Sequence, residues 1–548
     1  MATIYWLLRS LSPSLVALTL FTFISGFSTR ATAQGNETPP NILLVIADDL
    51  GVDASNGYHQ GGLMPTTPTL DSLRSVGITF ENVFAAPVCT PTRAAIMSAK
   101  YGVNTGVTGV PGNLDFSHTS IFTALADQTN NLYADAVIGK WHLSSPADPL
   151  HPAQHGADYH MGVIGGAVGD YYAWNKTENG TTSQETTYVT TAFTDAAIDW
   201  VNEQEDQHWF LWFAHVAPHS PLHVPPSHMY SVPTTGNNFR KYVAMIESVD
   251  YELNRLLYAM PDSVRENTLI IYMGDNGTPN NVLRDYPSGH GKGSLYQGGI
   301  RVPMIIAGAG VSRQGERESA LIHVSDIHAT LLEVAGAELP GGLYNSLSFH
   351  HLLTNAPGPT RDYNYSEGQN NGLSGFTIRG PQYKLIEYMD GSQEFYDLLN
   401  DSLEVSDLLA NTLTEEQLVI KADLEAEAEQ IRTAWSCRDH IQNGDEEEVD
   451  CGGSYCAPCV TATEDDPMAE SGLRVFPNPS SDVFRITSEH QPIQQITLRT
   501  ISGQIVKQLT AVNSMEVSLN VAHLSPQILL LEVTNATGVQ TRKVVKTP

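Results

Sequence analysis

Residues 41–51 of the chain read NILLVIADDLG, and this stretch decides the class of fold. The run Ile42–Ala47 is apolar at every position, without the polar alternation of a half-exposed strand. Such a short, uninterrupted run is typical of a buried strand in a parallel sheet. Asp48 and Asp49 follow directly, so two carboxylates are expected at the carboxyl end of this strand.

Three later apolar runs have the same character: Ala134–Ile138, Phe210–Phe213 and Leu269–Met273. Segments with helical periodicity lie between the runs, including Thr191–Glu205 and Lys241–Tyr258. Strands that alternate with helices in this way indicate a doubly wound α/β domain.

Polar residues follow the end of each predicted strand. Asp48-Asp49 follow the first strand, and Gly139-Lys140-Trp141-His142 follow the second. His219 comes after the third strand, and Asp275-Asn276 follow the fourth. Open α/β sheets bind their ligands at the carboxyl ends of strands, so we expect these residues to converge on one site.

Length and charge limit the class of protein. The chain has 548 residues, of which 41% are hydrophobic, and this suits a large α/β core with smaller appended domains. The formal net charge is −31. A field of this sign disfavours nucleic acid as a partner and also repels anionic substrates at long range. If the substrate is a sulfate ester, cationic side chains inside the site must overcome that field.

The N-terminus has the pattern of an export signal. Arg9 precedes the apolar stretch Leu15–Phe27, and Ala31-Thr32-Ala33 has the small-x-small pattern of a cleavage site. We therefore expect residues 1–33 to be a signal peptide and the protein to be secreted or held at the cell surface. A membrane anchor is the alternative, but the apolar stretch is short and interrupted.

The cysteines fall into two groups. Four of the 5 cysteines lie close together near the C-terminus: Cys437, Cys451, Cys456 and Cys459. In an exported protein this cluster predicts two disulfides, with three possible connectivities. A zinc site is the alternative, because Cys456 and Cys459 have ligand spacing. Cys89 stands alone, far upstream, and needs a different explanation.

The texture of the chain changes after about residue 360. Three short strands, Phe376–Arg379, Lys384–Tyr388 and Phe395–Asp397, predict a small antiparallel sheet, and a charged helix is expected over Thr414–Trp435. The alternating tail from Leu473 to Pro548 predicts a small β-sandwich. The expected domains are a catalytic α/β domain (34–360), a C-terminal subdomain (361–435), a cysteine-rich module (436–460), a linker (461–472) and the β-sandwich (473–548).

The segment Cys89-Thr90-Pro91-Thr92-Arg93 resembles the defining motif of the formylglycine-dependent sulfatases. By itself the motif is equally compatible with a buried structural thiol before a helix. Further segments resemble other signatures of the family, in family order: Asn41–Gly51, Tyr133–Leu143, Ala217–Pro221, Gly274–Gly277, Gly291–Gly293 and Gly298–Pro303. The resemblance covers roughly residues 38–435 and implies the alkaline-phosphatase-like sulfatase fold. Thr92 departs from the usual Ser or Ala, and Gln297 stands where Glu is common.

The resemblance implies a role for each candidate residue. A maturation enzyme would oxidise Cys89 to formylglycine, whose hydrate supplies one hydroxyl to attack sulfur and a second to release sulfate. The implied roles of the other residues are to hold formylglycine (Arg93), grip sulfate (Lys140 and Lys292), accept a proton during sulfate release (His142) and protonate the leaving oxygen (His219). His215 and His223 are candidates for the rim of the site.

The metal prediction rests on ligand chemistry as well as on the resemblance. Asp48, Asp49, Asp275 and Asn276 offer only oxygen atoms, which suit Ca²⁺ or, less well, Mg²⁺. For Asp48-Asp49 alone, capping of the next helix is the alternative.

The C-terminal segments carry resemblances of their own. Cys437–Cys459 is similar to a cysteine-rich module of exported Bacteroidetes proteins. Val475–Pro479, Ile501–Val506 and Lys543–Lys546 resemble the type IX secretion sorting domain, which implies passage through an outer membrane by that secretion machinery. A carbohydrate-binding β-sandwich is the alternative, although the tail has few aromatic residues.

Taken with the export signal, the resemblance implies a sulfatase that acts on a sulfated carbohydrate. The loops 165–187 and 278–288 are expected to select the sugar. One rival function is a phosphomonoester or phosphonate hydrolase on the same scaffold, and the other is a non-catalytic glycan-binding protein.

Overall fold

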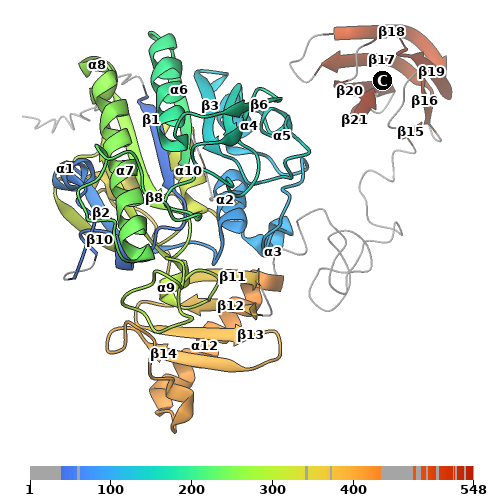
Figure 1. Cartoon of the computed structure of the whole chain (residues 1–548). Helices are drawn as coiled ribbons and strands as arrows, with labels where there is room; N and C mark the ends of the chain where they lie inside the picture. Colours follow the sequence, from blue (N-terminus) through green and yellow to red (C-terminus); the bar gives the residue numbers. More distant parts are fainter. Residues whose placement is uncertain are drawn as a thin grey trace, which may run out of the picture. The chain divides into compact units, whose positions relative to one another are not determined.

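The computed structural model divides into two compact units, residues 1–429 and 430–548, and each is described by itself (Figure 1). The predicted signal peptide, cysteine-rich module and linker lie outside the residues that the structure describes. The described residues are 39–58, 62–337, 339, 343–370, 373–433, 473–476, 483–488, 491–500, 505–522, 524, 527–535 and 538–546.

A 10-stranded sheet forms the centre of the first unit, in the order β10-β2-β9-β8-β1-β7-β3-β4-β5-β6. The four strands predicted from apolar runs are present as β1 (Asn41–Ala47), β3 (Tyr133–Lys140), β7 (His208–His215) and β8 (Thr268–Gly274). They pair in parallel, as predicted. The other strands are β2 (Ile78–Phe84), β4 (Tyr159–Val163), β5 (Trp174–Glu178), β6 (Thr181–Glu185), β9 (Arg301–Gly308) and β10 (Glu316–His323).

The sheet is mixed toward its edges. Strand β9 pairs antiparallel with both β8 and β2, and β5 pairs antiparallel with both β4 and β6. An all-parallel arrangement therefore holds only in the middle of the sheet, which is where the polar strand ends lie.

Helices cover both faces of this sheet (Figure 1). Leu43 and Val45 of β1 pack into one hydrophobic core, together with residues of α6 (Val189–Glu203) and α7 (Asn238–Ala259). Ile42, Leu44 and Ile46 pack into a second core, on the other face. Each fully buried aliphatic side chain contributes about 1.5–3 kcal/mol, and both faces are buried, which explains why β1 has no polar alternation.

The remaining helices are shorter, apart from the last. They are α1 (Pro68–Val76), α2 (Cys89–Ser98), α3 (Gly102–Thr105), α4 (Ile121–Thr129), α5 (His151–Gln154), α8 (Asp262–Glu266), α9 (Gln297–Ile300), α10 (Asp326–Val334), α11 (His350–Thr354) and α12 (Glu415–Thr433). In the described part of the chain, no helix combines the length and the apolar character needed to cross a membrane.

The register of the central strands brings the polar strand ends together. Ala47, the last residue of β1, pairs with His215 of β7 on one side and with Gly274 of β8 on the other. Asp48 and Asp275 are the next residues of their strands, so they lie side by side. This is the convergence expected at the carboxyl edge of a parallel sheet.

A small antiparallel sheet follows within the same unit, as predicted. Its strands are β11 (Asn364–Asn370), β12 (Leu373–Arg379), β13 (Tyr383–Tyr388) and β14 (Gln393–Asp397), in sequential order. Helix α12 then occupies most of the predicted charged segment.

The second unit consists of two antiparallel sheets around one hydrophobic core. One sheet contains β15 (Leu473–Phe476), β16 (Val483–Ser488) and β19 (Glu516–Asn520). The other contains β17 (Ile493–Thr500), β18 (Ile505–Ser514), β20 (Gln527–Asn535) and β21 (Gly538–Lys546). Phe484 and Ile486 of the first sheet share a core with Leu498 and Leu531 of the second, which is the packing of the predicted β-sandwich.

Candidate active site

Cys89 is the first residue of helix α2 and points toward the carboxyl edge of the central sheet. Its side chain is almost fully buried, and its Sγ lies 3.2 Å from Nδ1 of His142. Burial raises the pKa of the Cys89 thiol. The unmodified side chain is therefore poorly suited to act as a thiolate nucleophile.

Thr92 fastens the chain just before this helix. Its hydroxyl accepts a hydrogen bond at 2.9 Å from the backbone N–H of Ala86. The side chain is completely buried, so the extra methyl group, relative to serine, is accommodated in the folded protein.

Arg93 connects the nucleophile helix to two strand ends. Its guanidinium donates to Asp275 Oδ2 from Nε at 3.1 Å and from Nη2 at 2.8 Å. Nη1 donates to the backbone carbonyl of Lys140 at 2.8 Å. Burial alone would raise the pKa of Asp275, but Arg93 and then Lys140 outweigh it and lower that pKa. Asp275 is therefore a permanent carboxylate.

Lys140 and Asp48 form a second buried ion pair, with Nζ 2.5 Å from Oδ2. Both side chains are fully buried. Burial raises the pKa of Asp48 to about 6, although Lys140 acts in the opposite direction. Charges at this depth require close partners, and the ion pairs with Lys140 and Arg93 supply them.

Asp49 joins the remaining predicted residues. Its Oδ1 lies 2.5 Å from Lys292 Nζ and accepts from Asn276 Nδ2 at 2.8 Å. Its Oδ2 lies 3.7 Å from His219 Nε2. Burial would lower the pKa of Lys292, but the Asp49 carboxylate outweighs that effect and raises it, so Lys292 is cationic. The structure thus brings every predicted site residue into one connected group.

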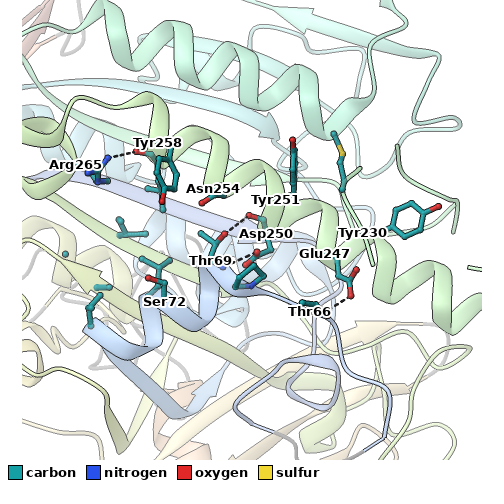
Figure 2. A pocket seen from close by; sticks show the side chains of 18 of the residues that line it. Thr66, Thr69, Ser72, Tyr230, Glu247, Asp250, Tyr251, Asn254, Tyr258 and Arg265 are labelled. Carbon is teal, nitrogen blue, oxygen red and sulfur yellow. Dashed lines mark hydrogen bonds between the residues drawn. The ribbon is translucent and has the colours of Figure 1, made fainter. Parts of the chain in front are cut away.

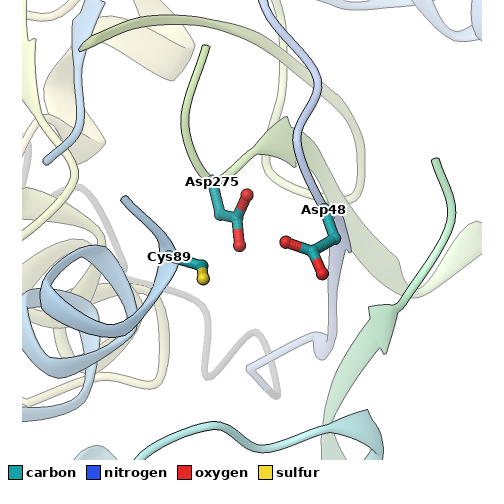
Figure 3. A group of neighbouring side chains, drawn as sticks. All are labelled: Asp48, Cys89 and Asp275. Carbon is teal, nitrogen blue, oxygen red and sulfur yellow. The ribbon is translucent and has the colours of Figure 1, made fainter. Parts of the chain in front are cut away.

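Two buried oxygen atoms in this group accept no hydrogen bond within the described part of the chain: Asp48 Oδ1 and Asn276 Oδ1. Leaving such acceptors unsatisfied is costly. Ligand atoms of Asp48, Asp275 and Cys89 also lie within 4.8 Å of one another, and Figure 3 shows these side chains directed toward a common space. A cation bound by oxygen would satisfy both atoms, so the residues present fit a hard divalent ion.

The backbone is strained at two site residues. Asp49 and His142 have φ values of 65° and 56°, in the left-handed region that side chains other than glycine rarely adopt. Such conformations concentrate at functional sites, where the surrounding structure maintains them. Burial, followed by Lys140 and Arg93, lowers the pKa of His142 to about 2, so its imidazole is neutral at physiological pH.

Several supporting residues were not identified from the sequence. The Tyr242 hydroxyl donates to the Asp49 carbonyl at 2.6 Å, and the Thr278 hydroxyl donates to Asp53 Oδ1 at 2.6 Å. The Tyr171 hydroxyl donates to the His219 carbonyl at 2.7 Å. Tyr171 belongs to the loop 165–187 that was assigned to sugar selection, but no sequence pattern marks Tyr242.

The expectation that His215 lines the rim is wrong. Its side chain is completely buried beside Phe213, because it points from β7 into the core rather than out of the site. His223 is partly buried, and its ring lies 4.0 Å from that of Tyr171.

A separate groove of about 980 Å³ lies along α1 and α7 (Figure 2). None of the predicted site residues lines it. Its carboxylates already bind backbone: Asp250 accepts from Leu70 N at 2.8 Å and Glu247 accepts from Thr66 N at 2.8 Å. These groups attach the start of α1 to α7, which is a structural role.

Family models match three parts of the chain. The model described as "Sulfatase" matches residues 40–337, and "N-sulphoglucosamine sulphohydrolase, C-terminal" matches residues 290–434. "Secretion system C-terminal sorting domain" matches residues 474–547.

Individual relatives agree with the first two matches. Arylsulfatase J of Mus musculus is 27% identical over 324 residues, covering 55% of this chain and 53% of the relative. N-acetylgalactosamine-6-sulfatase of Homo sapiens is 26% identical over 347 residues, covering 56% and 64%. The chain thus spans between half and two thirds of the length of these curated relatives.

Among solved structures, Ps i-CgsB in complex with k-i-k-neocarrahexaose is similar with a TM-score of 0.63 and 26% identity. The similarity covers 74% of this chain and 94% of that one. Because the sulfatase model spans more than half of the sequence and the predicted motifs converge at one sheet edge, the chain belongs to the sulfatase family.

Proposed function

We propose that this protein is an exported sulfatase that hydrolyses sulfate esters of a carbohydrate, with formylglycine made from Cys89 as its nucleophile. The position of Cys89 carries the proposal. It begins a helix at the sheet edge, beside the neutral His142 and next to the buried group of Asp48, Asp275, Arg93 and Lys140.

The local environment suits the modified residue better than the thiol. Burial keeps the cysteine protonated, so as a thiol it would be a weak nucleophile. Formylglycine, when hydrated, supplies a hydroxyl for attack on sulfur and a second hydroxyl for the release of sulfate. His142 is neutral and its Nδ1 faces position 89, so it can accept the proton that leaves during sulfate release.

Asp48, Asp49, Asp275 and Asn276 would hold a divalent cation, for which Ca²⁺ is our proposal. The unsatisfied oxygens of Asp48 and Asn276 support this assignment. A bound cation supplies Lewis-acid polarisation and charge neutralisation at the sulfate.

Cationic side chains would grip the sulfate. Lys292 is partly exposed and cationic, with its Nζ against Asp49, and Lys140 lies deeper against Asp48. These charges, together with Arg93, provide the local positive field that the net charge of −31 makes necessary.

His219 is placed to protonate the leaving group. Its Nδ1 lies 2.8 Å from the carbonyl oxygen of Ser220, which can only accept, so Nδ1 carries a proton. In the imidazolium form, Nε2 also carries a proton, and this nitrogen lies 3.7 Å from the Asp49 carboxylate. The side chain is 16% exposed, so Nε2 can reach a substrate oxygen.

We expect His219→Ala to reduce activity on a sugar sulfate far more than on nitrophenyl sulfate. A sugar alkoxide is a poor leaving group that a general acid assists by roughly 10²–10⁴-fold, whereas nitrophenolate leaves as a stable anion. The measurement is kcat/KM of the variant and the wild type on both substrates.

His142→Ala is the matched control, because release of sulfate is common to both substrates and both should slow. Equal losses on the two substrates with His219→Ala would mean that His219 only positions sulfate. An aryl phosphate assayed in parallel separates a sulfatase from a phosphomonoester hydrolase, and we expect the sulfate to be the better substrate.

The substrate class is inferred from the relatives. The printed names of two of them refer to N-acetylgalactosamine-6-sulfate and to a neocarrahexaose complex, both of them carbohydrates. With an export signal and a sorting domain, a sulfated polysaccharide or oligosaccharide is the proposed substrate. A formylglycine-generating enzyme is the proposed maturation partner.

Deleting residues 473–548 is expected to block delivery to the cell surface in the native host and to leave catalysis unchanged. The tail has its own hydrophobic core, and the sorting-domain match covers residues 474–547. Cell fractionation and activity of the purified, matured protein measure the two effects. A truncated protein that carries formylglycine but hydrolyses nothing would show that the tail belongs to the catalytic body.

A further inference from the structure

Residues 290–297, which we call the Lys292 segment, are fastened to the catalytic edge at two points. Lys292 N–H donates to the Thr278 carbonyl at 2.9 Å, and Gly293 N–H donates to the Pro87 carbonyl at 2.8 Å. Thr278 lies two residues after Asn276, and Pro87 lies two residues before Cys89. The position of the Lys292 ammonium therefore depends on how this segment is held.

The other end of the segment is held by a buried ion pair in the C-terminal subdomain. Lys384 of β13 lies with Nζ 2.5 Å from Glu404 Oε1, and both side chains are fully buried. Lys384 Nζ also donates to the Leu295 carbonyl at 2.7 Å. Glu404 Oε2 accepts from the backbone N–H of Gln297 at 2.5 Å. Each charge of the pair thus binds the backbone of the Lys292 segment.

Apolar contacts strengthen the same attachment. Leu295 is buried in a small cluster with Ile386, Tyr396 and Leu398 of the antiparallel sheet. The ring of Tyr296 stacks on that of His290 at 3.6 Å. The segment is therefore clamped between the catalytic edge and the small sheet.

This ion pair is costly to maintain. Burial raises the pKa of Glu404 and lowers the pKa of Lys384, so both groups are opposed in their charged forms by their surroundings. Glu404 also has a φ of 58°, which is unfavourable for a residue with a side chain. Well-packed apolar residues often give equal stability in place of a buried ion pair, so stability alone does not account for this arrangement.

We propose that Lys384 and Glu404 are positioning residues for the sulfate grip. By fixing the backbone of Leu295 and Gln297, they hold Lys292 at the depth where its Nζ meets Asp49 and, by the proposed function, the sulfate. The C-terminal subdomain thereby controls the rate of the chemical step without contacting the reacting atoms. The inference rests on the proposed function for its catalytic consequence, and on the contacts above for its structural one.

Two matched double variants test the proposal. Lys384→Met with Glu404→Met removes the charges and the hydrogen bonds to the segment, whereas Lys384→Gln with Glu404→Gln removes the charges but keeps a donor and an acceptor. On nitrophenyl sulfate, we expect the double Met variant to lose about 10-fold to 10²-fold in kcat, since small displacements of a catalytic group cost this much. The double Gln variant should stay within about threefold of the wild type. Equal kcat in the two variants overturns the proposal.

A mutant cycle shows whether the effect acts through Lys292. Lys292→Ala should cost much less in the double Met background than in the wild type, because the two changes disrupt the same interaction. An undiminished cost would mean that the ion pair serves stability alone. The control is Arg313→Met with Glu318→Met, which removes an ion pair of 2.6 Å at edge strand β10 and should leave kcat unchanged.

Hydrogen exchange provides a readout that needs no turnover. Amides of residues 290–297 should exchange at least about tenfold faster in the double Met variant, with β1 and β7 unchanged. Unchanged exchange in the segment overturns the proposal, whereas a wild type that hydrolyses no sulfate ester would refute only the proposed function. If the double Met protein does not fold, Glu404→Gln and Glu404→Leu form the second pair, and only the leucine variant should lose kcat.

Discussion

Replacing Cys89 with alanine is expected to reduce kcat/KM for every sulfate ester by on the order of 10⁴–10⁶-fold, as loss of a covalent nucleophile does. Turnover needs both hydroxyls of the modified residue, and alanine provides neither. The fold should be retained, because the hydrogen bond that Sγ makes is the one to His142. Mass spectrometry of the wild-type peptide should show the aldehyde, and thermal unfolding of the variant should resemble that of the wild type.

Cys89→Ser is the informative control for this experiment. Serine has one hydroxyl, so it can be sulfated once but has no second hydroxyl to release the sulfate. We expect at most a single turnover and a serine that carries a sulfate group. A fully active wild-type protein that contains only free thiol at position 89 would contradict the assignment of formylglycine.

Asp275→Asn is expected to lower both Ca²⁺ binding and activity, the latter on the order of 10³-fold or more, because several kcal/mol of charge stabilisation are lost with the metal. Part of this loss has another origin, since Arg93 would keep its buried charge without its carboxylate partner. Calorimetric titration with Ca²⁺ and nitrophenyl sulfate kinetics measure the two effects on the same sample.

Asn276→Ala separates the metal from the ion pair. Asn276 bears no charge, and its Oδ1 accepts no hydrogen bond in the described residues, so its loss should weaken the metal while Arg93 keeps Asp275. In the wild type, Ca²⁺ at 100 times its Kd should raise the stability by about 2.7 kcal/mol, and this increase should shrink in the variant. Full activity of protein freed of metal by chelation would refute the metal site.

The predictability of this fold depended on the environment of each strand. The run Ile42–Ala47 is buried on both faces, so its composition alone identified β1. Strands β5 and β6 at one edge are largely polar, and β6 is mostly exposed, so no hydrophobic pattern marked them. The antiparallel insertion of β9 was also missed, because pairing direction depends on how the chain returns to the sheet rather than on local composition.

Residues of the candidate site were recognisable for a related reason. Each follows a predicted strand end or belongs to a short motif, as Asp48 follows β1 and Arg93 belongs to the segment around Cys89. The residues that support them, Tyr242 and Tyr171, come from elsewhere along the chain and act through single hydroxyl groups. Such contacts leave no spacing rule in the sequence.

The sequence by itself determined which residues meet at the sheet edge, because a parallel sheet brings the carboxyl ends of its strands together whatever the details of packing. It did not determine how those residues pair. Only the tertiary structure decided that Asp48 binds Lys140, that Asp49 binds Lys292, and that the Lys292 segment is clamped by Lys384 and Glu404. The physical reason is that ion pairs and hydrogen bonds require distances near 3 Å, and these depend on backbone turns and side-chain depth that distant parts of the chain set together.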